Sequence, residues 1–113
     1  MEHYQDRLSG ILHALADPTR RAVVGRLAAG PAAVSDLARP FSMALPSFMK
    51  HIRLLEESGL IRTRKAGRVR TCAIDPAPLA ALEGWLAAQK AIWEGRADRL
   101  EAFVTREMTE NPE

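Results

Sequence analysis

The sequence predicts a mainly α-helical fold of the α+β class, with four helices, one β-hairpin and a longer final helix. Apolar residues recur at three- and four-residue steps in several short stretches, which is the spacing of one helical face. Strand-forming residues flank Ala66-Gly67, a pair that suits a hairpin turn. No proline occurs between Pro78 and Pro112, so the last helix can be long. Two short helices followed directly by a hairpin form a winged helix-turn-helix.

The composition is that of one soluble domain over residues 1–113. Hydrophobic residues make up 47% of the chain and charged residues 27%, which is typical of a globular protein. There is no apolar run of about 18 residues, and the first residues lack the pattern of a signal peptide. Cys72 is the single cysteine, so no internal disulfide can form. We therefore expect a cytoplasmic protein that does not contact a membrane.

The first helix is predicted over residues 4–15 and the second over residues 18–29. An apolar stripe indicates the first helix and consists of Tyr4, Leu8, Ile11, Leu12 and Leu15. Asp17-Pro18 begins the second helix, because aspartate is a good N-cap and proline fits the first helical turn. We expect this helix to bury Ala22, Val23 and Leu27 and to expose Arg20, Arg21 and Arg26.

A third helix over residues 34–39 and a fourth over residues 45–58 form the helix-turn-helix pair. Pro40 stops the third helix, and Pro46 fits the first turn of the fourth, where its missing N–H has no intrahelical partner to lose. The apolar face of the fourth helix consists of Leu45, Phe48, Ile52 and Leu55. Its polar side carries Ser47, Lys50, His51 and Arg53. Gly59 supplies the left-handed residue that commonly ends a helix.

The hairpin is predicted over residues 60–74. Basic residues crowd its tip, namely Arg64, Lys65, Arg68 and Arg70. An isolated two-stranded hairpin is only marginally stable, so this one must pack on the helices. A basic tip of this kind suits contact with phosphate groups or with the minor groove of DNA.

The last helix is predicted over residues 76–108 and begins at Asp75-Pro76. About 30 helical residues span roughly 45 Å, whereas a compact domain of this size is only about 30 Å across. The apolar stripe of this helix therefore needs a partner, and a second copy of the chain is the economical one. The expected interface includes Leu8, Leu12, Leu82, Trp85, Leu86, Trp93 and Leu100. The alternative is a break near Gly95 that folds the end of the chain back.

Charge is unevenly distributed, although the net charge is only +2. Residues 46–72 contain seven basic and two acidic residues, whereas residues 76–113 contain four basic and seven acidic ones. A basic middle and an acidic end are expected when one face meets a polyanion. The alternative is a charged surface that is simply solvated.

Four segments carry recognisable motifs: Leu15-Ala-Asp-Pro-Thr-Arg-Arg21, Val34-Ser-Asp-Leu-Ala38, the stretch Leu45-Pro-x-x-x-Lys-His-Ile-x-x-Leu-Glu-Glu-x-Gly-Leu60, and Gly67-Arg-x-Arg70. Together they resemble the ArsR-type (ArsR/SmtB-like) family of winged-helix repressors over roughly Leu8 to Leu100. The resemblance implies the element order α-α-α-α-β-β-α, with a homodimer interface made by the first and last helices. It also implies binding to an operator with two-fold symmetry.

The resemblance further implies DNA contacts from the fourth helix and the hairpin, through Ser47, Lys50, His51, Arg64, Lys65, Arg68 and Arg70. Arg53 is added as a DNA contact because it lies on the polar side, although it could instead pair with Glu57. Met49 stands where a serine is usual in the family, and Ala44 stands where a serine often caps the helix. Either a hydrogen bond to DNA is lost, or Met49 makes an apolar contact such as one to a thymine methyl group.

Members of the family often sense metals, but no metal and no cofactor are predicted here. Thiolate sensing needs two or three cysteines, and no histidine follows His51 to make a zinc site in the last helix. His3 and His13 do not face each other within the first helix, which leaves a site shared between chains as the alternative. Cys72 is predicted to be a small buried residue, with a redox-sensitive thiol as the alternative.

The sequence thus predicts a DNA-binding transcriptional regulator, a homodimeric repressor that places residues 44–58 in the major groove of double-stranded DNA. An enzyme is not expected, because no paired carboxylates, Cys/His or Ser/His arrangement and no glycine-rich phosphate loop have a plausible spacing. The effector is not identified. The remaining alternative is a winged-helix module that binds another protein instead of DNA.

Overall fold

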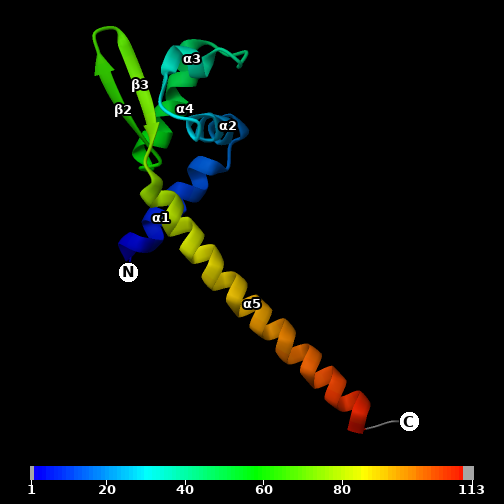
Figure 1. Cartoon of the computed structure of the whole chain (residues 1–113). Coiled ribbons are helices and arrows are strands. Elements are labelled where there is room, and N and C mark those ends of the chain that lie inside the picture. Colours follow the sequence, from blue (N-terminus) through cyan, green and yellow to red (C-terminus); the bar gives the residue numbers. More distant parts are fainter. Residues whose placement is uncertain (1, 111–113) are drawn as a thin grey trace. The chain divides into compact units, whose positions relative to one another are not determined.

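The computed structural model describes the backbone of residues 2–110 and the side chains of residues 5–108. Its elements, in order, are α1 (Glu2–Leu15), α2 (Pro18–Leu27), β1 (Ala32–Ala33), α3 (Val34–Ala38), α4 (Leu45–Glu57), β2 (Ile61–Ala66), β3 (Val69–Ile74) and α5 (Pro76–Glu110) (Figure 1). The chain divides into two compact units, Met1–Leu82 and Glu83–Glu113. All strands and α1–α4 belong to the first unit, and the described part of the second is helical.

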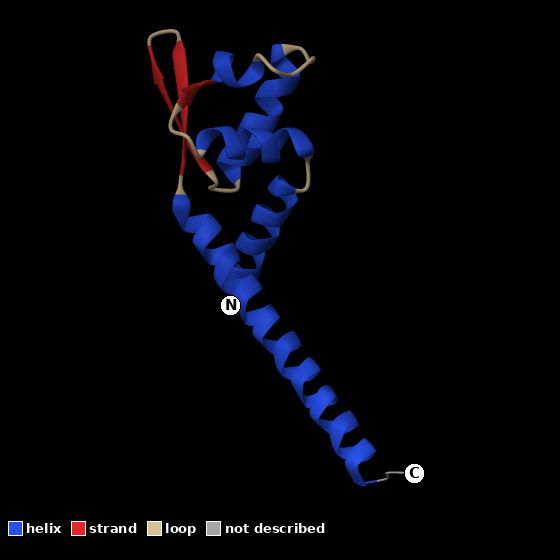
Figure 2. Cartoon of the chain, turned by 45° about the vertical axis from the view of Figure 1, so that its right-hand side comes forward, coloured by secondary structure: helices blue, strands red, loops and turns tan. Residues whose placement is uncertain are grey.

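The predicted fold class, a mainly helical winged helix-turn-helix, is confirmed, and one strand was missed. The strands pair in the order β1-β3-β2, all antiparallel (Figure 2). Gly67 turns the β2–β3 hairpin with a φ of 62°, a conformation that glycine adopts without a steric penalty. The missed strand, β1, places Ala32 opposite Cys72 and Ala33 opposite Thr71.

Both aspartate-proline pairs begin helices as predicted. The Asp17 carboxylate accepts a hydrogen bond from the backbone N–H of Arg20 at 3.0 Å, and Asp75 accepts one from the N–H of Ala77 at 3.0 Å. The end of α4 is also as predicted, because Gly59 follows it with a φ of 84°. Ala44, by contrast, occupies the N-cap position of α4 without any side-chain hydrogen bond.

One core joins α1–α4 to the sheet. Its fully buried side chains come mainly from α4 and from the strands: Phe48, Ile52, Leu55, Leu60, Ile61 and Cys72. The rings of Phe41 and Phe48 stack with their centroids 5.6 Å apart, which fastens the turn before α4 to the helix. The hairpin tip and α3 lie at one end of the first unit and α1 lies at the other (Figures 1 and 2).

Several predicted positions are wrong. Leu45 was expected in the core but is 55% exposed, because it lies at the first residue of α4, at the edge of the buried face. Ala22 is exposed, whereas Arg20, expected in solvent, is 9% exposed. Leu8 was expected at an interface between copies but is buried within the first unit. Tyr4, from the predicted first stripe, lies outside the residues whose side chains are described.

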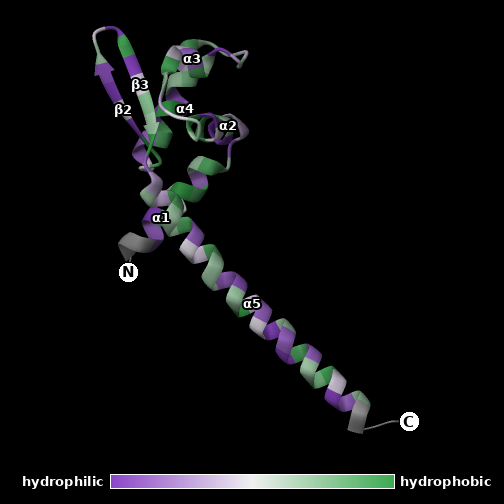
Figure 3. Cartoon of the chain, in the orientation of Figure 1, coloured by the Kyte–Doolittle hydropathy of each residue, from purple (hydrophilic) through white to green (hydrophobic). Residues whose placement is uncertain are grey.

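The last helix, α5, runs without interruption from Pro76 to Glu110, so the alternative of a break near Gly95 is wrong. Hydrophilic and hydrophobic residues alternate along it (Figure 3). Large apolar side chains are nonetheless exposed along the part of α5 that belongs to the second unit, including Leu86, Trp93, Leu100 and Phe103. None of the described helices is long and apolar enough to cross a membrane.

Candidate nucleic-acid interface

The outer side of α4 is polar and open. Phe48, Ile52 and Leu55 hold the helix on the core, and the side chains of Ser47, Lys50 and Arg53 are exposed. Among the described side chains, Arg53 makes no ion pair with Glu57, which was the alternative to a role in binding. The helix thus presents one hydroxyl group and two cations that are free to meet a ligand.

The wing, formed by β2, β3 and their turn, places a second set of cations beside α4. Arg64, Lys65 and Arg68 are exposed, and Arg70 is half-buried. Lys65 and Arg70 lie directly opposite each other in the strand register. Like charges at opposite positions of two strands repel each other. An anion bound across the hairpin would relieve that repulsion.

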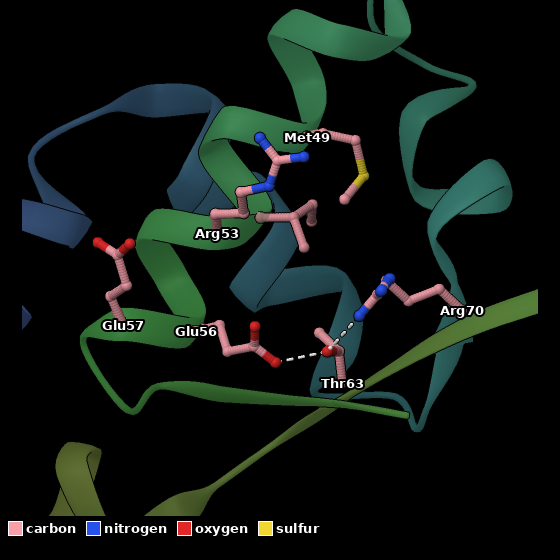
Figure 4. Close-up of a pocket in the computed structure, with 7 residues that line it drawn as sticks. Met49, Arg53, Glu56, Glu57, Thr63 and Arg70 are labelled. Carbon is pink, nitrogen blue, oxygen red and sulfur yellow. Dashed lines mark hydrogen bonds between the residues drawn. The ribbon is translucent and has the colours of Figure 1, made fainter. Parts of the chain in front are cut away.

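Hydrogen bonds hold the wing against the end of α4. Thr63 donates from its hydroxyl group to the Glu56 carboxylate and accepts a bond from Nη1 of Arg70 at 3.0 Å (Figure 4). These residues line a cavity of about 350 Å³ between α4 and the wing, together with Met49, Ile52, Arg53 and Glu57. The side chains that face this cavity therefore come from both binding elements.

Arg62 is basic but belongs to the base of the wing rather than to its tip. Its Nε and Nη2 atoms donate to the same Asp75 carboxylate oxygen at 3.1 and 3.0 Å. The pKa of Asp75 lies below its usual value, mainly because of the hydrogen bond from the Ala77 N–H and further because of Arg62. This pair joins the first residues of the hairpin to the start of α5 and leaves the tip cations separate.

His51 does not face the open side of α4, contrary to the prediction. Its side chain is 23% exposed, and its Nδ1 lies 3.0 Å from Nη1 of Arg20 and 3.8 Å from the Asp17 carboxylate. A guanidinium has only donors, so Nδ1 accepts and the proton of the neutral ring is on Nε2. The turn between α1 and α2 thus lies against this side of α4.

Arg20 makes that contact and was missed as a positioning residue. Its Nε donates to the carbonyl oxygen of Ala14 at 2.6 Å and its Nη2 to that of His13 at 3.1 Å. Both carbonyls belong to the last turn of α1, where helical partners are lacking. Arg20 therefore caps α1 and supports α4 at the same time. Its position in the sequence could have indicated this role, because Arg20 lies three residues after the N-cap Asp17, in the first turn of α2.

The residues predicted at the dimer interface differ in exposure. Leu8 is 4% exposed because α1 packs against the first turns of α5 within the first unit, with Ala81 among the neighbours of Leu8. It is therefore not accessible to a second copy. Leu12 is 43% exposed, and Leu82 and Trp85 are half-buried. Leu86, Trp93 and Leu100 are exposed and remain available.

Cys72 is fully buried, as predicted. Burial raises the pKa of its thiol, and the Glu56 charge adds to that effect. A buried protonated thiol is unreactive, which disfavours the redox alternative. Within the residues whose side chains are described, no three His, Cys, Asp or Glu side chains are grouped as metal ligands; His3 lies outside that part.

Comparisons with known proteins agree with this architecture. A helix-turn-helix domain model matches residues 15–64, which cover α2, β1, α3, α4 and the beginning of the wing. The chain is 48% identical over 69 residues to the HTH-type transcriptional regulator Rv2034 of Mycobacterium tuberculosis. That match covers 61% of this chain and 64% of the relative, so the chain spans just under two thirds of the relative's length.

Solved structures are similar over more of the chain. The crystal structure of an ArsR family transcriptional regulator is 67% identical, covers 80% of this chain and 93% of its own, and superposes with a TM-score of 0.78. The solution structure of a homodimeric winged helix-turn-helix DNA-binding domain from Mycobacterium bovis is 22% identical, with a TM-score of 0.61. It covers 78% of this chain and 83% of its own, and at that identity it supports the fold alone.

Proposed function

Because the chain belongs to the ArsR family of transcriptional regulators, we propose that it is a cytoplasmic homodimeric repressor that binds a two-fold-symmetric DNA operator. The observation that carries this proposal is the pairing of a free polar face on α4 with a basic wing beside it. Lys50 and Arg53 come from the helix, and Arg64, Lys65 and Arg68 come from the wing.

The two elements have different tasks. In helix-turn-helix proteins the second helix lies in the major groove and its N-terminal residues reach the base edges. Ser47 and Lys50 would therefore contact bases or phosphates in the major groove. The wing cations neutralise phosphates along the backbone or minor groove and release counterions, which contributes affinity without reading sequence.

His51 has a changed role in this proposal. Its Nδ1 is occupied by Arg20, so only the Nε2–H of the neutral ring can donate to DNA. Arg20 therefore fixes the tautomer of the ring and its orientation. A phosphate oxygen is a suitable acceptor for that single donor.

Dimerisation supplies the two-fold symmetry. The Mycobacterium bovis domain is described as homodimeric, and the present chain has exposed apolar side chains on α5 that a second copy could cover. Leu12, Leu86, Trp93 and Leu100 are the exposed candidates from the expected interface, and Leu82 and Trp85 are half-buried. Leu8 is no longer included, since it is buried in its own chain.

A gel-shift titration with the genomic region upstream of the chain's own gene tests the proposal. We expect a discrete shifted band whose affinity falls steeply as salt increases, because several phosphates are neutralised. The absence of any shift at low salt, with this region and with fragments of it, would overturn the repressor proposal. It would favour a winged-helix module that binds another protein.

A further inference from the structure

The first turn of α4 presents apolar side chains toward the wing. Leu45 is 55% exposed, and Val69, at the first residue of β3, is 52% exposed. With Met49 they line a cavity of about 240 Å³, which we call the apolar notch. Its other lining residues are Ala33, Val34, Ser35, Arg68 and Arg70.

We propose that the apolar notch recognises thymine in the major groove through the 5-methyl group of the base. This inference rests on the proposed binding of DNA by α4 and the wing. Leucine, methionine and valine side chains offer no hydrogen bond to a base edge. Among the groups that the four base pairs present in the major groove, the thymine methyl is the apolar one.

The position of the notch favours this occupant. N-terminal residues of a recognition helix are the ones that reach base edges, and Leu45 is the first residue of α4. Ala44 offers no hydroxyl group, so the polar readout that a serine would provide is missing at the same turn. At this turn, base preference therefore depends on apolar contact as well as on the exposed Ser47 hydroxyl group.

The charges around the notch favour nucleic acid over an uncharged apolar ligand. Arg68 and Arg70 form one wall, and Lys50 is exposed one turn further along α4. A base in the notch would have the phosphates of its own strand close to these cations. The cavity between α4 and the wing is also lined by Met49 and Arg70, so it adjoins the notch.

A DNA duplex that the full-length chain selects from a random double-stranded library is the probe for this test. Each thymine of the selected duplex is then replaced, one at a time, by uracil, which lacks only the methyl group. Removing a methyl group from an apolar contact should weaken binding about fourfold. We expect this loss at one or two thymines per half-site. Replacement by 5-bromouracil, whose bromine is close to a methyl group in size, should restore the affinity.

Two variants assign the effect to the notch. Leu45→Ala and Met49→Ala should reduce the preference for thymine over uracil toward one, while the salt dependence stays unchanged. Lys65→Ala is the matched control, because Lys65 is an exposed wing cation outside the notch and its loss should weaken binding to both duplexes equally. Because Leu45 is exposed, its variant should keep the wild-type circular dichroism spectrum.

The outcomes separate the two proposals. A chain that selects and binds no duplex at all would overturn the proposed function and this inference with it. Tight binding with equal affinity for thymine and uracil at every position would overturn only the inference. A thymine preference that survives both Leu45→Ala and Met49→Ala would place the reading of the methyl group elsewhere, and would also overturn it.

Discussion

Arg20 joins three parts of the structure, although its sequence context predicted a solvent-exposed side chain. Its guanidinium donates to two carbonyl oxygens of α1 and to the ring of His51 on α4. A buried guanidinium is stabilised only when its donors are satisfied, and here three separate partners satisfy them. The residue thereby joins the end of α1 to the side of the recognition helix.

Replacing Arg20 by Ala should lower the free energy of unfolding by about 3 kcal/mol, because buried charge-assisted hydrogen bonds are lost. Urea denaturation measures this difference. Arg21→Ala is the matched control, since Arg21 is exposed and donates one bond, to the Leu15 carbonyl. Its loss should be at most about 1 kcal/mol. Equal losses for the two variants would contradict the role given to Arg20.

Asp17 should make stability depend on pH. Its pKa is lowered in the folded chain, chiefly by the hydrogen bond from the Arg20 N–H and further by the positive charge of the Arg20 guanidinium. A lowered pKa gives stability that is complete above the unfolded value of 3.8 and is lost as pH falls through the folded pKa. Asparagine caps helices about as well as aspartate but carries no charge.

We therefore expect Asp17→Asn to be less stable than wild type at neutral pH, with the difference shrinking as pH falls below about 4. Urea denaturation across this range measures it. A difference that is constant from neutral pH down to about 3 would show that the charge of Asp17 is not the cause.

Residue-level roles were the least accessible from the sequence. The periodicity of α4 correctly separated buried Phe48, Ile52 and Leu55 from exposed Ser47 and Lys50. Periodicity could not predict whether residues at the edge of the buried face are buried or exposed, because that depends on which neighbouring element packs beside them. His51 is covered because α1 and α2 meet beside it, whereas the described residues leave 55% of Leu45 exposed.

At the scale of elements, the wing is fixed at its base and charged at its tip. Arg62 and Asp75 join the base to the start of α5, and the bonds from Glu56 through Thr63 to Arg70 fasten the middle to α4. These contacts leave Arg64, Lys65 and Arg68 available for phosphates. A rigid base with a free basic tip is suited to contact a DNA backbone in a fixed orientation.

Arg68→Ala should weaken binding to all DNA sequences alike and lower the slope of log affinity against log salt by about one. Lys90→Ala is the control, because Lys90 pairs with Glu94 on α5 and should leave the slope unchanged. Fluorescence anisotropy at several salt concentrations measures both slopes. An unchanged slope for Arg68→Ala would place the wing tip away from the DNA.

Most elements could be predicted because their signals are local. Asp17-Pro18 and Asp75-Pro76 mark helix starts through their own chemistry, and Ala66-Gly67 marks the hairpin turn. Strand β1 has no such signal, since two alanines show neither alternation nor a preference for strands. It exists because Ala32 and Ala33 meet the free edge of β3.

At the scale of the whole molecule, α5 has large apolar side chains that are exposed to solvent. Leu86, Trp93 and Leu100 recur every seven residues and therefore share one side of the helix. Exposed apolar surface of this kind marks an interaction site. In the proposed homodimer, a second copy of the chain covers this apolar surface.

Replacing Trp93 by Asp should convert the dimer into a monomer, because a carboxylate would be buried without a partner. Multi-angle light scattering measures the mass. Ala91→Asp is the matched control: at two residues' distance it lies on the opposite side of the helix and should remain dimeric. A Trp93→Asp chain that stays dimeric would move the interface away from this stripe.

The central claim is that two copies of α4 and the wing bind one symmetric stretch of DNA. Hydroxyl-radical footprinting on the region upstream of the chain's own gene tests it most directly. We expect two protected half-sites whose centres lie about 10–10.5 base pairs apart, or a multiple of that distance, because paired recognition helices enter successive major grooves. No protection at low salt, or one isolated protected site, would contradict the claim.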